Sequence, residues 1–310
     1  MRQKALATVY ELAKKDSKVV FIGSDLGAGT LQAMREDIPN QFFMEGISEQ
    51  HIVGFAAGLA QEGFIPYINT IGTFLTRRSF EQVSIDVGLH RLPVRLLSSG
   101  GGMVYAPLGP THTAIEDFSL MLSVPNMKVF SPADAYEMEN LLLAFFDDED
   151  PHYVRFGKGG EEVVTGDFPT FDLKPKVFGD ASSDVVLFTT GILLQHCLEA
   201  RAQLLSHGVT STVIHFPYLN DLSVEQIASA LTAARVIICA EEHVSRGGLY
   251  TQILHEFASA RIPVNNLYHR SLPSSFSHKY GSQIDHLDLH GLTGSKIADY
   301  AEVLLANNVE

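Results

Sequence analysis

The chain has 310 residues, 45% of them hydrophobic, so it is long enough for two α/β domains with filled cores and is not a disordered chain. Its formal net charge is -14, with 36 acidic against 22 basic residues, which excludes a surface built for the phosphates of nucleic acid. Only two cysteines occur, Cys197 and Cys239, which excludes a disulfide framework and predicts two buried thiols in a reducing compartment.

The N-terminal segment, 1–10, has the pattern of an amphipathic helix and lacks the apolar core of a signal peptide. No run of about 18 apolar residues, the length that spans a bilayer, occurs in the sequence. Together these patterns predict a cytoplasmic protein.

Short apolar runs then alternate with longer helical patterns, which is typical of βαβ units and a parallel sheet. The expected strands are 19–23, 64–68, 94–97, 127–130 and 153–156. The expected helices are 47–59, 74–87 and 135–146. These elements predict one α/β domain over residues 1–160.

Residues 161–181 are rich in Gly, Glu, Pro, Thr and Lys without a helical period, so we expect a linker there. The alternating pattern resumes in a second domain, 182–310. Its expected strands are 184–190, 211–216 and 235–243, with helices that end near Leu205 and begin near Gly247.

Four segments of the first domain could carry chemistry. Glu49 lies where a strand or loop turns into a glycine-rich apolar helix, a costly place for a carboxylate without a task, although the helix dipole alone could stabilise it. Phe74 and Phe80 stand near a helix start, as core residues or as a platform for a ligand. His112 follows a Gly-Pro-Thr turn and could be structural or catalytic. Arg155 ends a strand, where it could hold a phosphate or carboxylate or form a salt bridge.

In this order and at these separations, the four segments resemble the thiamine-diphosphate superfamily of transketolase, deoxyxylulose phosphate synthase and the β subunit of 2-oxoacid dehydrogenases. Further matching segments are 23–26, 125–127, 131–134 and 241–248. The resemblance covers essentially the whole chain and is strongest to the C-terminal subunit of two-gene transketolases. It implies an α/β fold, with a parallel-sheet, pyrimidine-type cofactor-binding domain followed by a transketolase C-terminal-like domain.

The resemblance also implies roles for matching residues. Glu49 matches the glutamate that hydrogen-bonds the aminopyrimidine ring of the cofactor, and Phe74 matches the aromatic residue that stacks on this ring. His112 matches the histidine near the reacting carbons, where an imidazole can shuttle protons. Arg155 matches a basic residue at the anionic end of the substrate, and Asp25 an acid near the cofactor. Three more residues are expected to line the cofactor pocket: Ile47, Ile71 and Phe80.

The metal motif of this superfamily is missing. There, a Gly-Asp-Gly sequence followed by Asn binds the divalent metal that holds the cofactor's diphosphate. The only Gly-Asp pairs here, Gly166-Asp167 and Gly179-Asp180, do not complete that motif. The resemblance therefore implies no metal ligands in this chain and an N-terminal partner subunit that holds the diphosphate with a Mg or Ca ion. An α2β2 heterotetramer is the simplest closed assembly.

Two other patterns are expected to carry no site. The segment 27–32 lacks the third glycine and the βαβ context of a dinucleotide fingerprint. The histidines near the C-terminus lack metal-ligand spacing, so we expect them in loops and at the rim: His269, His278, His286 and His290.

The substrate contacts depart from the transketolase pattern. Where transketolases carry a His-Asp pair and a further Asp that contact sugar hydroxyls, this chain has Gly100, Gly101 and Leu108. This departure favours a less hydroxylated substrate, such as a 2-oxoacid or a modified sugar.

We therefore expect a transferase of aldehyde or ketone residues in carbohydrate metabolism, which moves a ketol or acyl two-carbon unit from a ketose or 2-oxoacid donor to an aldehyde-type acceptor. A dehydrogenase β-type or deoxyxylulose phosphate synthase-like subunit is the alternative within the same chemistry, and the turn before His112 favours transketolase. A non-catalytic assembly module is the alternative of another class, and the presence of Glu49 together with Phe74 and His112 speaks against it. The donor, acceptor and pathway do not follow from the sequence.

Overall fold

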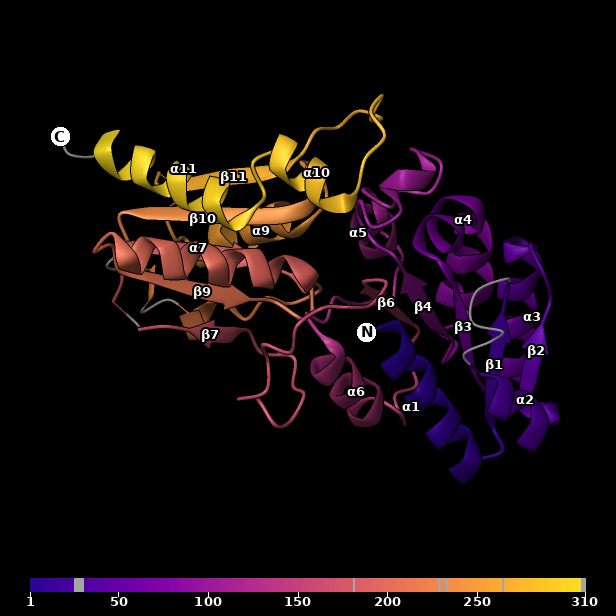
Figure 1. The fold of residues 1–310 in the computed structure, drawn as a ribbon. Helices are drawn as coiled ribbons and strands as arrows, with labels where there is room; N and C mark the ends of the chain where they lie inside the picture. Colours follow the sequence, from indigo (N-terminus) through magenta and orange to yellow (C-terminus); the bar gives the residue numbers. More distant parts are fainter. Residues whose placement is uncertain (25–30, 181, 228–229, 232–233, 264, 308–310) are drawn as a thin grey trace.

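The computed structural model describes residues 1–310 except 25–30, 181, 228–229, 232–233, 264 and 308–310. Figure 1 shows two α/β units that lie side by side, the first from indigo to magenta and the second from orange to yellow. Within the described residues, the strands form one sheet of six and one of five. The predicted fold class is thereby confirmed.

The sheet of the first domain is parallel throughout. Its strand order is β2-β1-β3-β4-β6-β5. The strands are β1 (Val19–Gly23), β2 (Phe42–Met44), β3 (Ile65–Ile71), β4 (Arg95–Ser99), β5 (Lys128–Phe130) and β6 (His152–Phe156). The carboxyl ends of parallel strands meet at one edge, and the register pairs Ile71 with Ser99 and Ser99 with Phe156. The loops that follow these three strands therefore gather at that edge.

Helices cover both faces of this sheet. They are α1 (Arg2–Lys15), α2 (Gln32–Asp37), α3 (Glu49–Gln61), α4 (Phe80–Gln82), α5 (Asp117–Leu122) and α6 (Ala135–Ala144). Short 3-10 turns are η1 (Pro39–Gln41) and η4 (Ala106–Leu108). In α1, Ala5, Leu6, Val9 and Leu12 are buried, a helical spacing that faces the core beside α6 (Figure 1).

The helix predicted over 74–87 is helical but irregular. Two π-helical segments, η2 (Phe74–Arg78) and η3 (Val83–Leu89), flank the short α4. At the end of η2, the Ser79 hydroxyl donates to the Phe74 carbonyl at 3.1 Å, a partner five residues back. Wide turns of this kind are frequent at functional sites, because they turn side chains out of the regular helical row.

The second domain has a mixed sheet of order β11-β10-β8-β9-β7, in which only β7 runs antiparallel to its neighbour among the described strands. The strands are β7 (Lys176–Phe178), β8 (Val185–Thr189), β9 (Ser211–His215), β10 (Val236–Val244) and β11 (Leu267–Leu272). Its helical segments are η5 (Gly191–Leu193), α7 (Leu194–Ser206), η6 (Val224–Ile227), α9 (Leu249–Ala260), α10 (Gln283–Leu289) and α11 (Gly294–Asn307).

The described part of the segment predicted as a linker, 161–180, is mostly exposed but has two ordered features. It contains β7, a strand too short for a periodic pattern to reveal. It also contains Phe171, 8% exposed, whose ring lies 6.1 Å from that of Phe130 and 5.8 Å from that of Phe145. The connection is therefore fixed against the first domain before it joins the second sheet.

The two domains share their apolar packing. One cluster of buried side chains contains Ile68 of the first sheet and Phe188 of the second. Both cysteines are buried and free, as predicted, and burial raises the pKa of the Cys197 thiol to about 12. In the part of the chain that the structure describes, we find no helix with the length and apolar character needed to cross a membrane.

Candidate active site

Glu49 is the first residue of α3 and lies at the carboxyl edge of the first sheet, just after β2. Its carboxylate is in the first turn of the helix, where the helix dipole favours a negative charge. The residue is 2% exposed and accepts a hydrogen bond from Nη1 of Arg78 at 2.6 Å. The Arg78 side chain is 44% exposed, so it can turn to solvent and leave Glu49 to another donor.

Arg78 also covers the ring of Phe74. Both residues belong to η2, and the guanidinium carbon lies 4.4 Å from the centroid of the ring. A planar, delocalised group is thus stacked on Phe74 and hydrogen-bonded to Glu49 at the same time. These are the two contacts that the resemblance assigns to an aminopyrimidine ring, so Glu49 and Phe74 fit that group.

His112 lies in the loop between β4 and α5. Gly109 has φ +84°, a conformation that favours glycine, and its carbonyl accepts from the His112 amide at 3.0 Å. The imidazole meets the Phe74 ring edge to face, with centroids 5.3 Å apart. Its Nδ1 lies 2.9 Å from the Thr111 hydroxyl, and among the described residues no hydrogen bond to Nε2 is found.

Arg77 ties η2 to the His112 loop. Its Nη2 donates to the Thr113 carbonyl at 2.9 Å, and its Nε lies 3.1 Å from the carboxylate of Glu116. Because of these bonds, the segment with Phe74 and the loop with His112 hold a fixed relation. Three predicted residues from three segments, Glu49, Phe74 and His112, therefore lie in one continuous row of contacts.

The other predicted cofactor residues lie in different settings. Ile71 ends β3 and is 7% exposed, and Phe80 is a half-buried residue at the start of α4. Ile47 is 72% exposed, in the loop before α3. Asp25 lies outside the described residues. Of these four, Ile71 lies at the end of β3, just before η2, and Phe80 lies at the start of α4, just after η2. Both are therefore close in the chain to Phe74, the first residue of η2.

The glycines after β4 have no room for side chains. A Cβ on Gly100 would lie 2.0 Å from the Tyr105 ring, and one on Gly101 would lie 2.1 Å from Nε of Arg155. Both distances are far inside van der Waals contact. Two of the three places where the resemblance expects side chains for sugar hydroxyls are therefore filled by Tyr105 and Arg155, whereas the third, Leu108, is 53% exposed.

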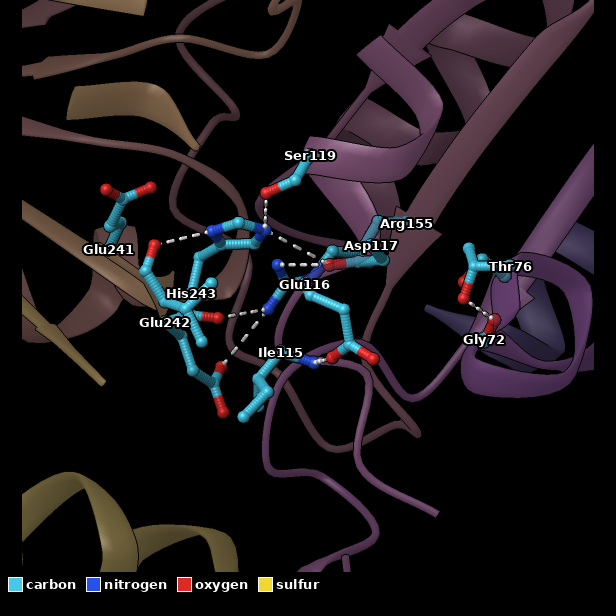
Figure 2. Close-up of polar contacts among 12 residues, drawn as sticks. Gly72, Thr76, Ile115, Glu116, Asp117, Ser119, Arg155, Glu241, Glu242 and His243 are labelled. Carbon is cyan, nitrogen blue, oxygen red and sulfur yellow. Dashed lines mark hydrogen bonds and ion pairs between the residues drawn. The ribbon is translucent and has the colours of Figure 1, made fainter. Parts of the chain in front are cut away.

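Arg155, predicted to contact the substrate, is in a buried cluster of polar contacts between the domains (Figure 2). Its side chain is 7% exposed. Nη1 donates to the Asp117 carboxylate at 3.2 Å, Nη2 donates to the Glu242 carbonyl at 2.7 Å, and the guanidinium stacks 4.4 Å over Phe118. A substrate anion would have to displace these partners to reach it.

The cluster continues on both sides of Arg155. The Tyr153 hydroxyl donates to Asp117 at 2.7 Å, and burial together with this carboxylate raises the pKa of Tyr153 well above its usual value. His243, fully buried, lies 4.0 Å from Asp117 and stacks on Phe118. All of these groups are buried and partnered, so the cluster holds the domains together.

The predicted position of the C-terminal histidines in loops and at the rim is wrong for two of them. His286 is buried in α10, and His269 is part of β11. Ligand atoms of His269, Cys239 and Glu241 lie within 4.8 Å of one another, a spacing that a metal could use. However, Glu241 already accepts from His269 at 2.8 Å and from the Leu249 amide at 2.7 Å, so this carboxylate caps the N-terminus of α9.

Sequence reasoning did not assign a role to Glu242, Asp117 or Tyr105. The signal for Glu242 was present, because two adjacent carboxylates end the apolar run of β10, where a buried acid needs partners. No local pattern distinguishes Asp117 from an ordinary acid in the first turn of a helix. Tyr105 becomes informative only through the space that it fills beside Gly100.

Comparison with known proteins gives two family matches. Residues 1–160 match the transketolase pyrimidine-binding domain, and residues 178–297 match the transketolase C-terminal domain. A split gene transketolase, solved as an inactive beta4 tetramer, superimposes with a TM-score of 0.87 at 27% identity and covers 98% of each chain.

Two curated relatives differ in length. The 1-deoxy-D-xylulose-5-phosphate synthase of Dictyoglomus thermophilum is 31% identical over 94% of this chain and 47% of that protein, so the chain spans about half of it. One of the subunits of the apulose-4-phosphate transketolase of Phocaeicola vulgatus is 30% identical over 90% of this chain and 92% of that subunit.

Proposed function

Because the chain belongs to the transketolase family, we propose that it is the C-terminal subunit of a two-chain, transketolase-like transferase that depends on thiamine diphosphate. The observation that carries the proposal is the row formed by Glu49, Arg78, Phe74 and His112. An assembly module has no need of a buried carboxylate, a stacking ring and an imidazole in line at an open edge.

The cofactor, when bound, supplies an electron sink for breaking a carbon-carbon bond beside a carbonyl. In our proposal Glu49 hydrogen-bonds the aminopyrimidine ring and Phe74 stacks on it, after Arg78 has turned out to solvent. Ile71 and Phe80 line the pocket. Ile47, which is 72% exposed in the isolated chain, closes the pocket only when a partner covers it.

His112 would handle protons at the substrate. Its Nδ1 is occupied by the Thr111 hydroxyl at 2.9 Å, so Nε2 is the atom that can face a reacting oxygen. An imidazole there can donate a proton to a developing alkoxide and accept it back.

The filled space after β4 supports a proposal for the substrate class. With Tyr105 and Arg155 against Gly100 and Gly101, side chains that recognise sugar hydroxyls have no room there. We propose that a ketol or acyl two-carbon unit passes from a less hydroxylated ketose or a 2-oxoacid to an aldehyde-type acceptor. Arg155 stays a predicted contact for the anionic end, its burial weighs against this role, and Arg78 is the alternative.

The proposed partner is an N-terminal subunit that holds the diphosphate through a Mg or Ca ion, in a cytoplasmic α2β2 heterotetramer. The lengths of two relatives support a split enzyme. The chain corresponds to 47% of a single-chain synthase but to 92% of a separate transketolase subunit. A two-chain site needs groups from both halves, and closed symmetry then repeats it.

The test begins with the purified chain. In calorimetry with thiamine diphosphate and Mg, the chain alone should bind weakly, because the family's metal motif is missing from its sequence. Tight, metal-dependent binding to the isolated chain would contradict the split-enzyme proposal.

The second stage uses the enzyme reconstituted with a chain that contains Gly-Asp-Gly and Asn. Glu49→Gln should still assemble, yet slow exchange of the thiazolium proton by orders of magnitude, about 100- to 10,000-fold as for lost acid-base catalysis. The control is Glu45→Gln, which neutralises an exposed carboxylate in the loop before α3 and should leave exchange unchanged. Wild-type exchange in Glu49→Gln would refute the central assignment.

A further inference from the structure

The loop that carries His112 is closed at its base by its own backbone. Gly102 donates to the Ala114 carbonyl at 2.8 Å, and Ala114 donates back to Gly102 at 3.0 Å. The residues between them reach out to the turn of His112. We call the chain from Gly102 toward His112 the outgoing leg of the loop, and the chain that returns through Ala114 to Ile115 the returning leg. Contacts that fix these two legs beside the bridge therefore fix the position of the imidazole.

Both legs are held by the second domain. On the outgoing leg, the Met103 amide donates to Oε1 of Glu242 at 2.7 Å. On the returning leg, the Ile115 carbonyl accepts from the Val244 amide at 2.8 Å. Glu242 and Val244 are at the same end of β10, so one strand end of the second domain clamps the loop of the first.

Apolar side chains of the two legs also pack against the second domain. Met103 is 3% exposed and Ile115 is 8% exposed. They belong to the buried cluster that includes Leu272 and Leu287 of the second domain. The legs of the His112 loop are therefore built into the core of the other domain rather than into their own.

Glu242 is the acidic member of this clamp and is itself held firmly. Gln283 Nε2 donates to its two carboxylate oxygens at 2.9 and 3.0 Å, and Nη2 of Arg155 lies 4.0 Å away. Glu241 next to it points elsewhere, to the N-terminus of α9 (Figure 2). Neighbouring side chains of a strand face opposite ways, so the two acids have separate tasks.

We infer that Glu242 is a positioning residue, through which the second domain orders the His112 loop for the reaction. The inference rests on the proposed function for the role of His112, but the clamp itself can be measured without turnover. A domain that lies outside the row of Glu49, Phe74 and His112 would thereby contribute to catalysis.

The first test is amide hydrogen exchange of the chain alone. In Glu242→Ala, exchange of residues 101–115 should rise roughly 10- to 100-fold, because the Met103 amide loses its buried hydrogen-bond acceptor. Glu242→Gln keeps an acceptor oxygen and should restore most of the protection. The control is Glu241→Gln, on the same strand, which should raise exchange around α9 and leave 101–115 unchanged.

Gln283→Ala provides a milder route, should Glu242→Ala fail to fold. Gln283 is half-buried, and its loss frees the Glu242 carboxylate without removing it. Exchange in 101–115 should then rise several-fold. Unchanged exchange in every folded variant, or an equal rise in Glu241→Gln, would overturn the inference.

Kinetics of the reconstituted enzyme separate positioning from a general loss of structure. Glu242→Ala should lower kcat toward the level of His112→Ala, with KM for thiamine diphosphate unchanged within about twofold, since Glu49 and Phe74 are untouched. Full kcat with a loosened loop would overturn the role in catalysis. If His112→Ala itself keeps full turnover, the proposed function of His112 fails, while the exchange experiment still judges the clamp.

Discussion

Arg78 and Arg155 make the same pair of contacts in two different regions of the molecule. Each guanidinium lies 4.4 Å from the centroid of a phenylalanine ring. Each also donates to a buried carboxylate, Glu49 at 2.6 Å in one case and Asp117 at 3.2 Å in the other. The Arg78 side chain is 44% exposed and the Arg155 side chain is 7% exposed.

The difference in exposure decides what each arrangement can do. Around Arg155, the second domain covers the guanidinium and supplies a further acceptor, the Glu242 carbonyl, which favours a structural pair. Around Arg78, one side is open, so the guanidinium can leave and another planar group can take its two contacts. In our proposal, what covers the two arrangements, rather than which residues they contain, distinguishes a ligand site at Arg78 from a structural ion pair at Arg155.

The largest expected effect tests this difference through stability. Arg155→Ala should lower the free energy of unfolding by about 3 to 5 kcal/mol, because it leaves the Asp117 carboxylate buried without its cation. Arg78→Ala should cost less, about 1 kcal/mol, because the Arg78 side chain is 44% exposed and water can take its place beside Glu49. Urea unfolding of the two purified variants, followed by circular dichroism, provides the comparison.

The same two variants also test the substrate role predicted for Arg155. Kinetics of the reconstituted enzyme would favour an anion contact if Arg155→Ala weakens substrate affinity while its unfolding curve matches the wild type. Equal losses of stability in Arg78→Ala and Arg155→Ala would show that exposure does not separate the two regions.

A smaller effect on stability is expected at the opposite end of β6, where the strand begins with the buried His152. Burial and the nearby Arg95 lower the pKa of His152 to about 4, and its Nε2 lies 3.0 Å from Asp148. For Asp148, burial raises the pKa, but hydrogen bonds from His152 and Lys128 outweigh it and hold the pKa well below its usual range.

The unfolded chain therefore binds a proton at His152 first, near its ordinary pKa of about 6.5. The stability contributed by neutral His152 is present above that pH and is lost as the pH falls toward 4, by about 2 to 3 kcal/mol. Urea unfolding at several pH values should show this slope, and His152→Gln should flatten it. An unchanged slope in the variant would assign the acid sensitivity to other groups.

The smallest effect is expected for Ile47, an apolar side chain at the open region that is 72% exposed. Ile47→Ser should change the free energy of unfolding of the isolated chain by less than about 0.5 kcal/mol, as for a surface residue. It should weaken assembly with the partner or retention of the cofactor, measured by analytical ultracentrifugation and calorimetry. A marked loss of stability in the isolated chain would mean that Ile47 already packs within it.

The sequence predicted the fold class and most central strands, and the strands that it missed lie at sheet edges. These are β2, β7 and β11. The first two have three residues each, and β11 is only half-buried over most of its length. Edge strands are short or polar because one side pairs with nothing, so they lack the apolar run that reveals a buried strand.

For the site, local patterns left alternatives open for Glu49, Phe74 and His112, each at a helix start or turn, and the family resemblance supplied their predicted roles. The solvent exposure of the Arg155 side chain could not be predicted from the sequence, because Glu242, which covers it, is 87 residues away in the chain. The glycines after β4 were visible in the sequence, but the Tyr105 ring that needs their space was not. What remained unpredicted depends on contacts between distant segments.

The bond between Met103 and Glu242 joins residues 139 positions apart, and this separation sets an order of events during synthesis. The strands of the first sheet are all made by Phe156, long before β10 leaves the ribosome. The early domain can therefore form its sheet, while Met103 and Ile115 wait for the later core that covers them. Contacts of such long range form late and slowly, so a nascent chain passes through a stage with these two side chains exposed and prone to aggregation.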